Sequence, residues 1–344
     1  MSLTIYNQKL DPEEEKQISA FVTLHPQATV FQSPVFYHFY LEHEKGFSPY
    51  YFVFRKDDQT IEAVMLAVII SQWKGWLTAL SSRCVVYGGP LVNNDNPNIL
   101  HTILSTLNQR LKHKAVFTQF RNFRQWDEPQ IRIFERQGFV MRPRLNLIIH
   151  LDTEEAVKAR FSPSRRRQLK NALAQDISVR PATDLNEVRK LYWLLAQLYR
   201  EKVRKPLPNQ EYFDAFFEKL VPRGYGIILV VLYQSDIIGG IVCPITPGQT
   251  ISELYVCGMD RRFPKLYPST VATWAAMAYG LKHKIQYFDF MGLGKPDQPY
   301  GVRDFKLRFG GQQINPGRFA RRNNKFIYLL AETGYNLLRS LKKI

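Results

Sequence analysis

The chain has 344 residues, of which 45% are hydrophobic and 13% aromatic, and its formal net charge at pH 7 is +17. This length exceeds the usual limit for one hydrophobic core, so we expect two domains, and the composition excludes a disordered or fibrous protein. The excess of Lys and Arg favours an anionic partner, such as nucleic acid, a phosphorylated substrate or anionic lipid; the alternative is a solvated basic surface with no specific partner.

The length of the apolar runs and the spacing of Cys and His residues argue against a membrane-spanning, disulfide-bonded or metal-binding protein. The longest apolar run, residues 63–70, is far shorter than the roughly 20 residues that cross a bilayer. The first residues are acidic and polar, unlike a signal peptide, so we expect a cytoplasmic protein. Cys84, Cys243 and Cys257 form no CxxC pair, and there is no HxH, HExxH, GxGxxG or GxxxxGK[ST] motif. We therefore expect no metal, no disulfide and no cofactor.

The hydrophobic pattern of the first half predicts a helix, a series of strands, and a second helix that leads into a further strand. The turn KDDQT separates the first two strands. In chain order, the expected elements are an aromatic-rich helix over 33–46, strands over 49–55 and 61–70, further strands up to residue 89, a helix over 98–114 and a strand over 115–120.

The second half repeats this order. Its expected elements are a helix over 211–220, strands over 225–233, 237–245 and 250–258, a helix over 268–284 and a strand over 285–290. The letters LKHK end the last helix of each half, at 111–114 and at 281–284. We therefore expect two tandem units in which LKHK marks the same corner between a helix and a strand.

A helix, a run of antiparallel strands and a helix that delivers a parallel strand are the layout of the acyltransferase fold known as GNAT. The expected class is thus α/β (α+β), with two tandem GNAT-like domains, each a mixed, mostly antiparallel sheet flanked by helices. We place the first at residues 1–150, the second, with the substrate cleft, at 151–320, and a basic amphipathic helix at 321–344. This helix is expected either to pack on the protein or to contact the anionic inner face of a membrane.

The most distinctive stretch is YFDFMGLGKPDQPYGVRDFKLRFGG, residues 287–311. A strand is followed by a loop with three glycines and two prolines, which is the kind of defined turn that carries binding residues at the end of a strand. In the helix that follows, Arg303 and Lys306 share one face while Phe305 and Phe309 face the core. The stretch predicts a binding loop with fixed cations; a solvated basic helix face is the alternative.

Several segments together resemble the Fem family of peptidyl transferases. They are FQSP at 31–34, GGPLV at 88–92, SRRRQLKNAL at 164–173, YREKVRKPLP at 199–208 and the stretch 287–311. The resemblance implies two GNAT-like domains and an enzyme, needing no cofactor, that moves an amino acid from aminoacyl-tRNA onto the peptide of a UDP- or lipid-linked muropeptide, a peptidoglycan precursor.

The resemblance also implies residue roles. Lys306 would stabilise the oxyanion that forms when an amine attacks the aminoacyl ester, with Phe305 beside it against the acceptor end of the tRNA. Arg204, helped by Lys205, corresponds to a cation that holds the phosphates of the precursor. Family members often carry an acid where this chain has Asn93, so the general base stays unassigned. We expect Lys306→Met to lower turnover about a hundredfold or more, with little change in folding.

Other candidates are read from the residues around these motifs. Asp289 is either an inward acid near the active centre or the partner of a local arginine, and Tyr255 is expected to line the cleft. Arg303 is a further candidate for substrate contact. The candidates for contact with tRNA or other phosphates are Arg165, Arg166, Arg167 and Lys295.

Two rival functions use the same residues differently. An acyl-CoA N-acyltransferase would share the fold, but it would need a Gly-rich turn against the CoA pyrophosphate, and residues 261–269 read RRFPKLYPS, without glycine. We therefore expect acetyl-CoA to bind no better than about millimolar. The other rival is a non-catalytic binding protein of a cell-envelope polysaccharide pathway, because a fold alone does not fix a function.

Overall fold

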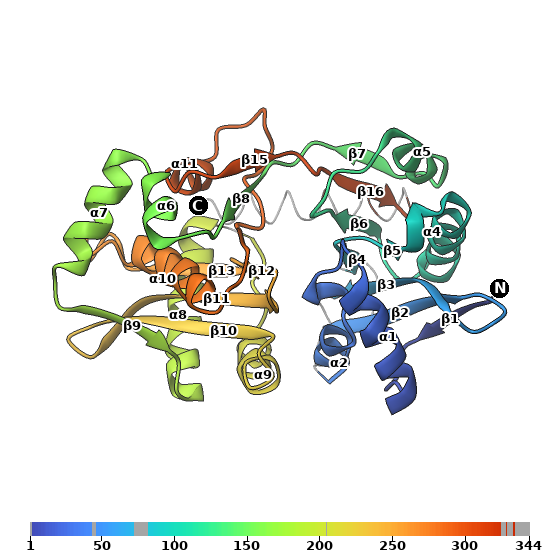
Figure 1. Ribbon diagram of the computed structural model, residues 1–344, viewed down its shortest axis with the longest axis horizontal. Coiled ribbons are helices and arrows are strands. Elements are labelled where there is room, and N and C mark those ends of the chain that lie inside the picture. Colours follow the sequence, from blue (N-terminus) through green and yellow to red (C-terminus); the bar gives the residue numbers. More distant parts are fainter. Residues whose placement is uncertain are drawn as a thin grey trace. The chain divides into compact units, whose positions relative to one another are not determined.

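The computed structural model describes residues 2–42, 46–71, 82–203, 205–324, 328 and 333. The chain forms two compact units. Unit 1 comprises Met1–Pro143 and Pro316–Ile344, and unit 2 comprises Arg144–Asn315. Figure 1 labels the elements of both units.

Unit 1 is built on a mixed sheet in which, among the described strands, only the β4/β6 pair is parallel. The strand order is β1-β2-β3-β4-β6-β16-β7, and β5 pairs with β3 beside β4. The strands are β1 (Ser2–Tyr6), β2 (Phe47–Arg55), β3 (Ile61–Ile70), β4 (Arg83–Tyr87), β5 (Leu91–Val92), β6 (Phe117–Arg121), β7 (Val140–Arg142) and β16 (Arg318–Arg322).

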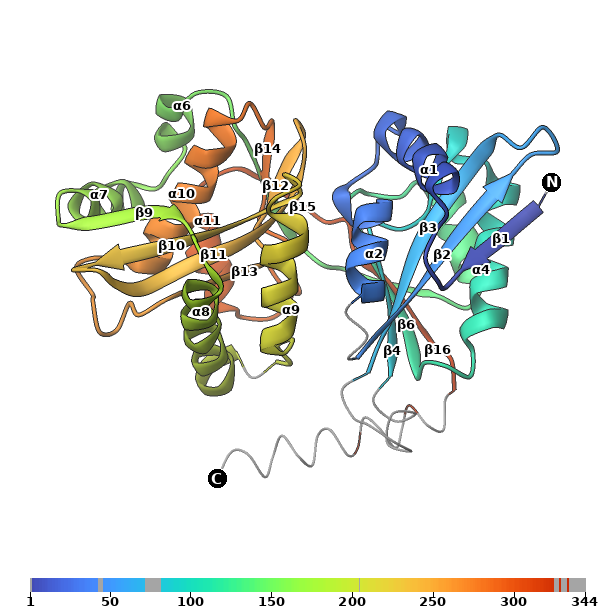
Figure 2. The same ribbon diagram turned by 90° about the horizontal axis from the view of Figure 1, so that it is seen from below.

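Helices cover both faces of this sheet, which explains why β2 and β3 are apolar along almost their whole length. Phe52 and its same-face neighbours pack with α4, while Tyr51 points the other way and contacts Tyr37 of α2, with 5.4 Å between ring centroids. Figure 2 shows α1 and α2 on one side of β2 and β3 and α4 on the other. The helices are α1 (Pro12–Leu24), α2 (Pro34–Glu42), α4 (Pro97–Leu111) and α5 (Glu128–Arg136), with short 3-10 turns at Val30–Gln32 and Asn93–Asp95.

Unit 2 repeats the plan. Its strand order is β15-β8-β14-β12-β11-β10-β9, and β13 pairs with β11 beside β12. The strands are β8 (Asn146–His150), β9 (Ile177–Pro181), β10 (Gly226–Tyr233), β11 (Asp236–Thr246), β12 (Thr250–Ser252), β13 (Tyr255–Gly258), β14 (Tyr287–Asp289) and β15 (Gln312–Ile314).

The two units match strand for strand. The order β2-β3-β4-β6 of unit 1 corresponds to β10-β11-β12-β14 of unit 2, and the last pair of each series is parallel. This confirms the prediction that residues 49–120 and 225–290 share one strand order, and the LKHK corners lie at the ends of α4 and α10 (Pro268–Lys282).

Compared with the predicted domains, the two sheets exchange one strand each, although unit 2 itself is continuous in the chain and only β16 returns from beyond it to unit 1. The strand that lies between β6 and β7 is β16, which follows unit 2 in the chain, and the strand between β14 and β15 is β8, which follows β7 of unit 1 in the chain. A domain boundary between residues 150 and 151 is therefore misplaced, because residues 146–150 belong to the sheet of unit 2. Residues 321 and 322, expected to begin the C-terminal helix, end β16. Most of the rest of that helix lies outside the described residues.

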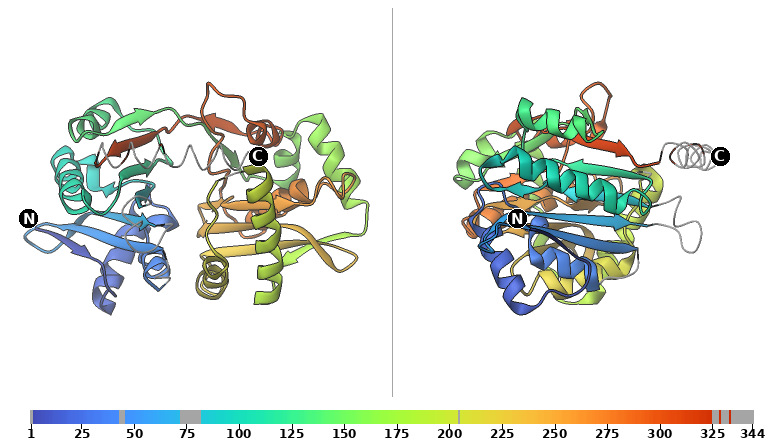
Figure 3. Two further views of the ribbon diagram at one scale, coloured as in Figure 1. Left: turned by 180° about the vertical axis from the view of Figure 1, so that it is seen from behind. Right: turned by 90° about the vertical axis from the view of Figure 1, so that its right-hand side faces the viewer.

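Helices also cover both faces of the unit 2 sheet. Figure 1 shows α10 in front of the sheet, and Figure 3 shows α8 from behind. Gly280 permits the close approach of α10, because a Cβ there would lie 2.6 Å from a methyl group of Leu151. The helices are α6 (Glu154–Ala159), α7 (Pro163–Leu173), α8 (Leu185–Leu198), α9 (Gln210–Ala215), α10 and α11 (Gly301–Leu307), with π-helical turns at Tyr199–Val203 and Phe216–Leu220. Within the described ranges, no helix combines the length and hydropathy that a bilayer span requires.

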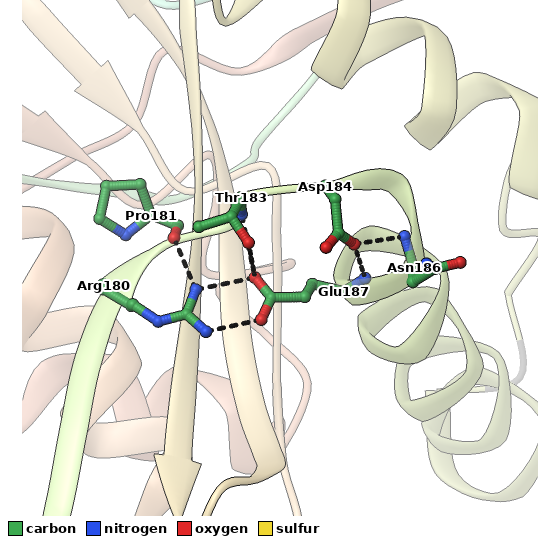
Figure 4. A network of polar contacts seen from close by, with 6 residues as sticks. All are labelled: Arg180, Pro181, Thr183, Asp184, Asn186 and Glu187. Carbon is green, nitrogen blue, oxygen red and sulfur yellow. Dashed lines mark hydrogen bonds and ion pairs between the residues drawn. The ribbon is translucent and has the colours of Figure 1, made fainter.

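The corner between β9 and α8 is fixed by a small polar network (Figure 4). The Arg180 guanidinium donates to both carboxylate oxygens of Glu187, at 2.6 and 2.8 Å. The amide and hydroxyl of Thr183 donate to the same carboxylate, and Asp184 caps the first amides of α8. These bonds, led by that of Arg180, lower the pKa of Glu187 to about 2.

Candidate active site

The candidate site of unit 2 lies where two parallel strands part. Strand β12 pairs with β14 from Thr250 to Ser252, and the next strand segment, β13, pairs with β11. The Glu253 amide donates to the carbonyl of Asp289 at 2.8 Å, directly after the last paired residues. The side chains of Glu253 and Asp289 thus start side by side at the carboxyl ends of parallel strands, which is where ligands bind in many α/β sheets.

Lys306 reaches this point from α11. Its ammonium nitrogen lies 2.6 Å from the carbonyl oxygen of Phe290 and 3.3 Å from that of Gly292, and it forms an ion pair with Glu253 at 3.1 Å. The side chains of Lys306 and Glu253 are only 9% and 1% exposed. Removing Lys306 would therefore leave the buried Glu253 carboxylate without its cation. The expectation that Lys306→Met causes little change in folding does not fit this geometry.

Both carboxyl groups have raised pKa values because they are buried. For Glu253, the Lys306 ammonium and a hydrogen bond from the Thr273 hydroxyl, at 3.1 Å, oppose the increase in pKa. For Asp289, a hydrogen bond from the Asn146 amide, at 2.8 Å, is the main opposing effect on the pKa. Burial therefore favours the protonated form of each group more than water does.

Asp289 has no arginine partner among the described residues, so of its two predicted environments the structure gives the inward acid. Its Oδ1 accepts hydrogen bonds from Asn146 Nδ2 and from the Met291 amide, the latter at 2.6 Å. Met291 has a φ of +58°, a left-handed conformation that is strained for a non-glycine residue. The Oδ1 atom of Asn146 is buried and has no hydrogen-bond partner among the described residues, so it can accept a further hydrogen bond.

The sequence patterns described above indicate neither Asn146 nor Glu253 as a site residue. The available signal for Glu253 was that it is the one acid in the predicted strand TISELYVCG, residues 250–258. Asn146 lies in the exchanged strand β8, and nothing local in the sequence places that strand beside β14.

Arg165 is not a phosphate contact, because it is 2% exposed and its partners are internal. Its guanidinium donates to Phe305 O at 2.9 Å and to the Thr270 hydroxyl, and it lies 4.4 Å from the ring centroids of Phe305 and Phe309. Burial lowers its pKa to about 10. Arg165 therefore joins α7, α10 and α11, and only its neighbours Arg166 and Arg167 are exposed.

Arg303 of α11 is hydrogen-bonded to the Gly-rich loop, which contains Lys295. The guanidinium of Arg303 donates to the carbonyl oxygens of Leu293, at 3.0 Å, of Pro296, at 3.3 Å, and of Lys295. These three bonds fold the loop onto α11. The described contacts thus give Arg303 a loop-positioning role, and its proposed contact with substrate remains a prediction.

The remaining candidates lie in two places. Tyr255 belongs to an aromatic group with Tyr199, Tyr212 and Phe213, with ring centroids 5.2–6.5 Å from its own. Lys205 is exposed and lies 5.3 Å from the ring centroid of Tyr300. Arg204 lies outside the described residues, and no group of three or more potential metal ligands occurs among the described ones.

The amide donors at the start of α10 are already engaged. Pro268 has no N–H, the Ser269 amide and hydroxyl donate to the Asp260 carboxylate, and the next two amides donate to the carbonyl of Tyr267. The equivalent helix of unit 1, α4, also begins with a proline, and the side chain of Asn96 caps its first amides. Free amides at a helix start are what a pyrophosphate group needs, and a carboxylate takes that place in unit 2.

Comparisons with known proteins agree with this architecture. Residues 160–306, within unit 2, match the family model described as acetyltransferase (GNAT) domain. No curated protein sequence matches the chain.

Solved structures extend the likeness to the whole chain. FemX is similar with a TM-score of 0.71 and 15% identity, over 96% of this chain and 99% of FemX. L-PGS from Bacillus licheniformis has a TM-score of 0.56 and 14% identity, over 95% and 98% of the two chains. A tandem GNAT protein from the clavulanic acid biosynthesis pathway has a TM-score of 0.58 and 10% identity, over 94% and 99%. At these identities the likeness concerns the fold, and it confirms the predicted tandem GNAT architecture.

Proposed function

We propose that the protein is an aminoacyltransferase that takes its acyl group from aminoacyl-tRNA and adds it to the peptide of a UDP- or lipid-linked muropeptide. The observation that carries the choice of donor is the start of α10, where Asp260 and Tyr267 engage the amides that an acyl-CoA pyrophosphate would need. A net charge of +17 suits a polyanionic donor. The resemblance of residues 287–311 and the other motif segments to the Fem family supports the acceptor class.

The reaction forms an amide bond and breaks the ester bond to the terminal ribose of the tRNA. An amine of the acceptor attacks the ester carbonyl, the carbonyl oxygen becomes an oxyanion, and the ribose oxygen leaves with a proton that the amine releases. Lys306 provides a positive charge at a buried, fixed position, where it stabilises an anion more than it would in water. In the transition state, the Lys306 N–H that faces Glu253 leaves the ion pair and donates a hydrogen bond to the oxyanion.

Asp289 and Asn146 act on the attacking amine in this proposal. Burial brings the pKa of Asp289 closer to neutral pH, which suits a group that accepts a proton from an ammonium and passes it on. The unpartnered Oδ1 of Asn146, next to Asp289, is a suitable acceptor for a second N–H of the same amine.

The other predicted contacts are assigned to the two substrates. Arg204 and Lys205 hold the phosphates of the muropeptide precursor, and Tyr255 with its aromatic neighbours lines the path of the acceptor peptide. Phe305, fixed between Arg165 and Phe309, packs against the acceptor end of the tRNA.

A donor-exchange experiment tests the proposal. The purified protein is incubated with UDP-linked or lipid-linked muropeptide and with either a mixture of radiolabelled aminoacyl-tRNAs or radiolabelled acetyl-CoA. We expect label to move to the muropeptide from aminoacyl-tRNA only. Transfer from acetyl-CoA would contradict the choice of donor, and no transfer from any donor would favour the non-catalytic alternative.

A further inference from the structure

Exposed cations gather in unit 2 around the start of α10. They come from three segments: α7, the turn that leads into α10, and the residue that follows α11. We call this group the α7–α10 surface; its members are Arg166, Arg167, Lys170, Arg261, Arg262, Lys265 and Arg308, all exposed. We propose that the α7–α10 surface binds the phosphate backbone of RNA, specifically the acceptor arm of a tRNA. The inference rests on the proposed function and adds the place where the donor is held.

Arg165 shows that the three segments adjoin. It lies in α7, it hydrogen-bonds to Thr270 in the first turn of α10 and to the carbonyl of Phe305 in α11, and it lies within electrostatic range of Arg308 and Asp260. Because Arg165 points inward, the helical spacing directs the next two residues and Lys170 to solvent. Segments that are distant in sequence thus present their cations around one buried guanidinium.

Few carboxylates offset the charge of this surface. Among the described residues, none of its seven members forms an ion pair; the Asp260 carboxylate accepts hydrogen bonds from Ser269, and the exposed Asp304 precedes Arg308 by one helical turn without an ion pair to it. Four other cations of unit 2 do form ion pairs: Arg180 with Glu187, Arg189 with Asp214, Lys158 with Glu154 and Arg160 with Asp152. An unpaired basic surface attracts a polyanion and costs self-repulsion when empty.

The make-up of the surface favours RNA over other anions. Five of its seven cations are arginines, whose planar fork binds phosphate through two hydrogen bonds. Their distribution over three segments suits a series of phosphates, whereas a single pyrophosphate would need the engaged amides of α10. An anionic membrane is the other polyanion; the exposed Leu173 and Leu307, close in sequence to these cations, would be its apolar anchors, and the vesicle measurement below distinguishes the two ligands.

The surface is also connected to the candidate active site. In α11, Lys306 points inward to Glu253, while Arg308, two positions on, is exposed on the α7–α10 surface. RNA bound through Arg308 and α7 would therefore hold its end within a few residues of Lys306. This is the arrangement that a donor esterified at its 3′ end requires.

RNA binding is measured by fluorescence anisotropy with an uncharged, dye-labelled tRNA acceptor minihelix, so that no transfer step enters the readout. The variants are Arg166→Gln/Arg167→Gln and Arg261→Gln/Arg262→Gln. The matched control is Lys282→Gln/Lys284→Gln, which removes the same charge from exposed residues at the other end of α10, about 20 Å away. Circular dichroism checks that all variants are folded.

We expect each test variant to weaken RNA binding about tenfold or more and to reduce the slope of log affinity against log salt by about 1.5, because each phosphate contact contributes about 0.7–0.9 to that slope. The control should change affinity less than about twofold. Equal losses in test and control variants, or no loss in either test variant, would overturn the assignment. So would a loss of binding to phosphatidylglycerol vesicles with RNA binding intact, which would identify a membrane surface. RNA binding with these properties but no aminoacyl transfer would sustain this inference and refute the proposed function.

Discussion

Lys306→Met is the substitution with the most specific expected consequence for stability. It removes the cation from Glu253, whose side chain is 1% exposed, and it leaves the carbonyl groups of Phe290 and Gly292 without their donor. Breaking a buried ion pair by removing one partner costs about 3–5 kcal/mol, and we expect a loss of this size in the free energy of unfolding of unit 2. The matched control is Lys282→Met, an exposed lysine on α10, for which we expect a change within about 0.5 kcal/mol.

The loss should depend on pH in a defined direction. The pKa of Glu253 is already raised by burial, and without Lys306 it rises further. An acid whose pKa is higher in the folded state than in the unfolded state stabilises the fold below its unfolded pKa, and this contribution is lost as pH rises through the folded pKa. The deficit of Lys306→Met should therefore be smaller at pH 5.5 than at pH 8.

A double-mutant cycle isolates the pair. Glu253→Gln keeps the side-chain volume and removes the buried charge, so Lys306→Met/Glu253→Gln should be less destabilised than the sum of the two single variants by about 1–3 kcal/mol. The assay is urea unfolding followed by circular dichroism, at both pH values. Additive losses, or a loss for Lys306→Met no larger than that for Lys282→Met, would refute the buried ion pair as the reason for the position of Lys306.

The exchanged strands predict that residues 1–143 alone will not unfold cooperatively, because β16 is missing between β6 and β7; the same fragment with residues 316–324 attached by a flexible linker should recover a cooperative transition. If both fragments unfold cooperatively, β16 is not needed for unit 1. Glu187→Gln should lower the free energy of unfolding at pH 7 by about 1 kcal/mol or less, a small value because Arg180 is 42% exposed and solvent screens the pair. Since the folded pKa of Glu187 is lowered to about 2 from 4.5, the difference from the unsubstituted protein should fade as pH decreases from about 4.5 towards 2, and a difference that persists at pH 2 would contradict the network. Acetyl-CoA should bind no better than about millimolar in calorimetric titration, because the start of α10 offers it no free amides; micromolar affinity would mean that the donor is held in another way.

The repeated plan of the two units could be predicted from local pattern. Apolar runs, turn residues and the two LKHK corners specify β2, β3, α4 and their counterparts within a few residues, because these features act over short stretches of chain. The exchange of β8 and β16 could not be predicted in this way. Both strands are short, and their pairing depends on the rest of each sheet more than on their own residues.

The candidate site was predictable only in part, for the same reason. The Gly-rich loop and FKLRFGG indicated Lys306, and the acid in YFDF indicated Asp289. The contact between Lys306 and Glu253 joins segments that are distant in sequence, so it depends on how α11 packs. Arg165 looked equivalent to its neighbours in PSRRRQLKNAL, yet one residue of a helical run must face inward, and the aromatic rings of α11 determine which one it is.

In the proposed reaction an aminoacyl group passes from tRNA to a muropeptide. Mass spectrometry of the muropeptide after incubation with the protein and a mixture of charged tRNAs measures this transfer. We expect a product heavier by one aminoacyl residue, formed only when the tRNA is charged and lost when the ester is hydrolysed beforehand. An unmodified muropeptide with charged tRNA, together with an acetylated product when acetyl-CoA is supplied, would contradict it.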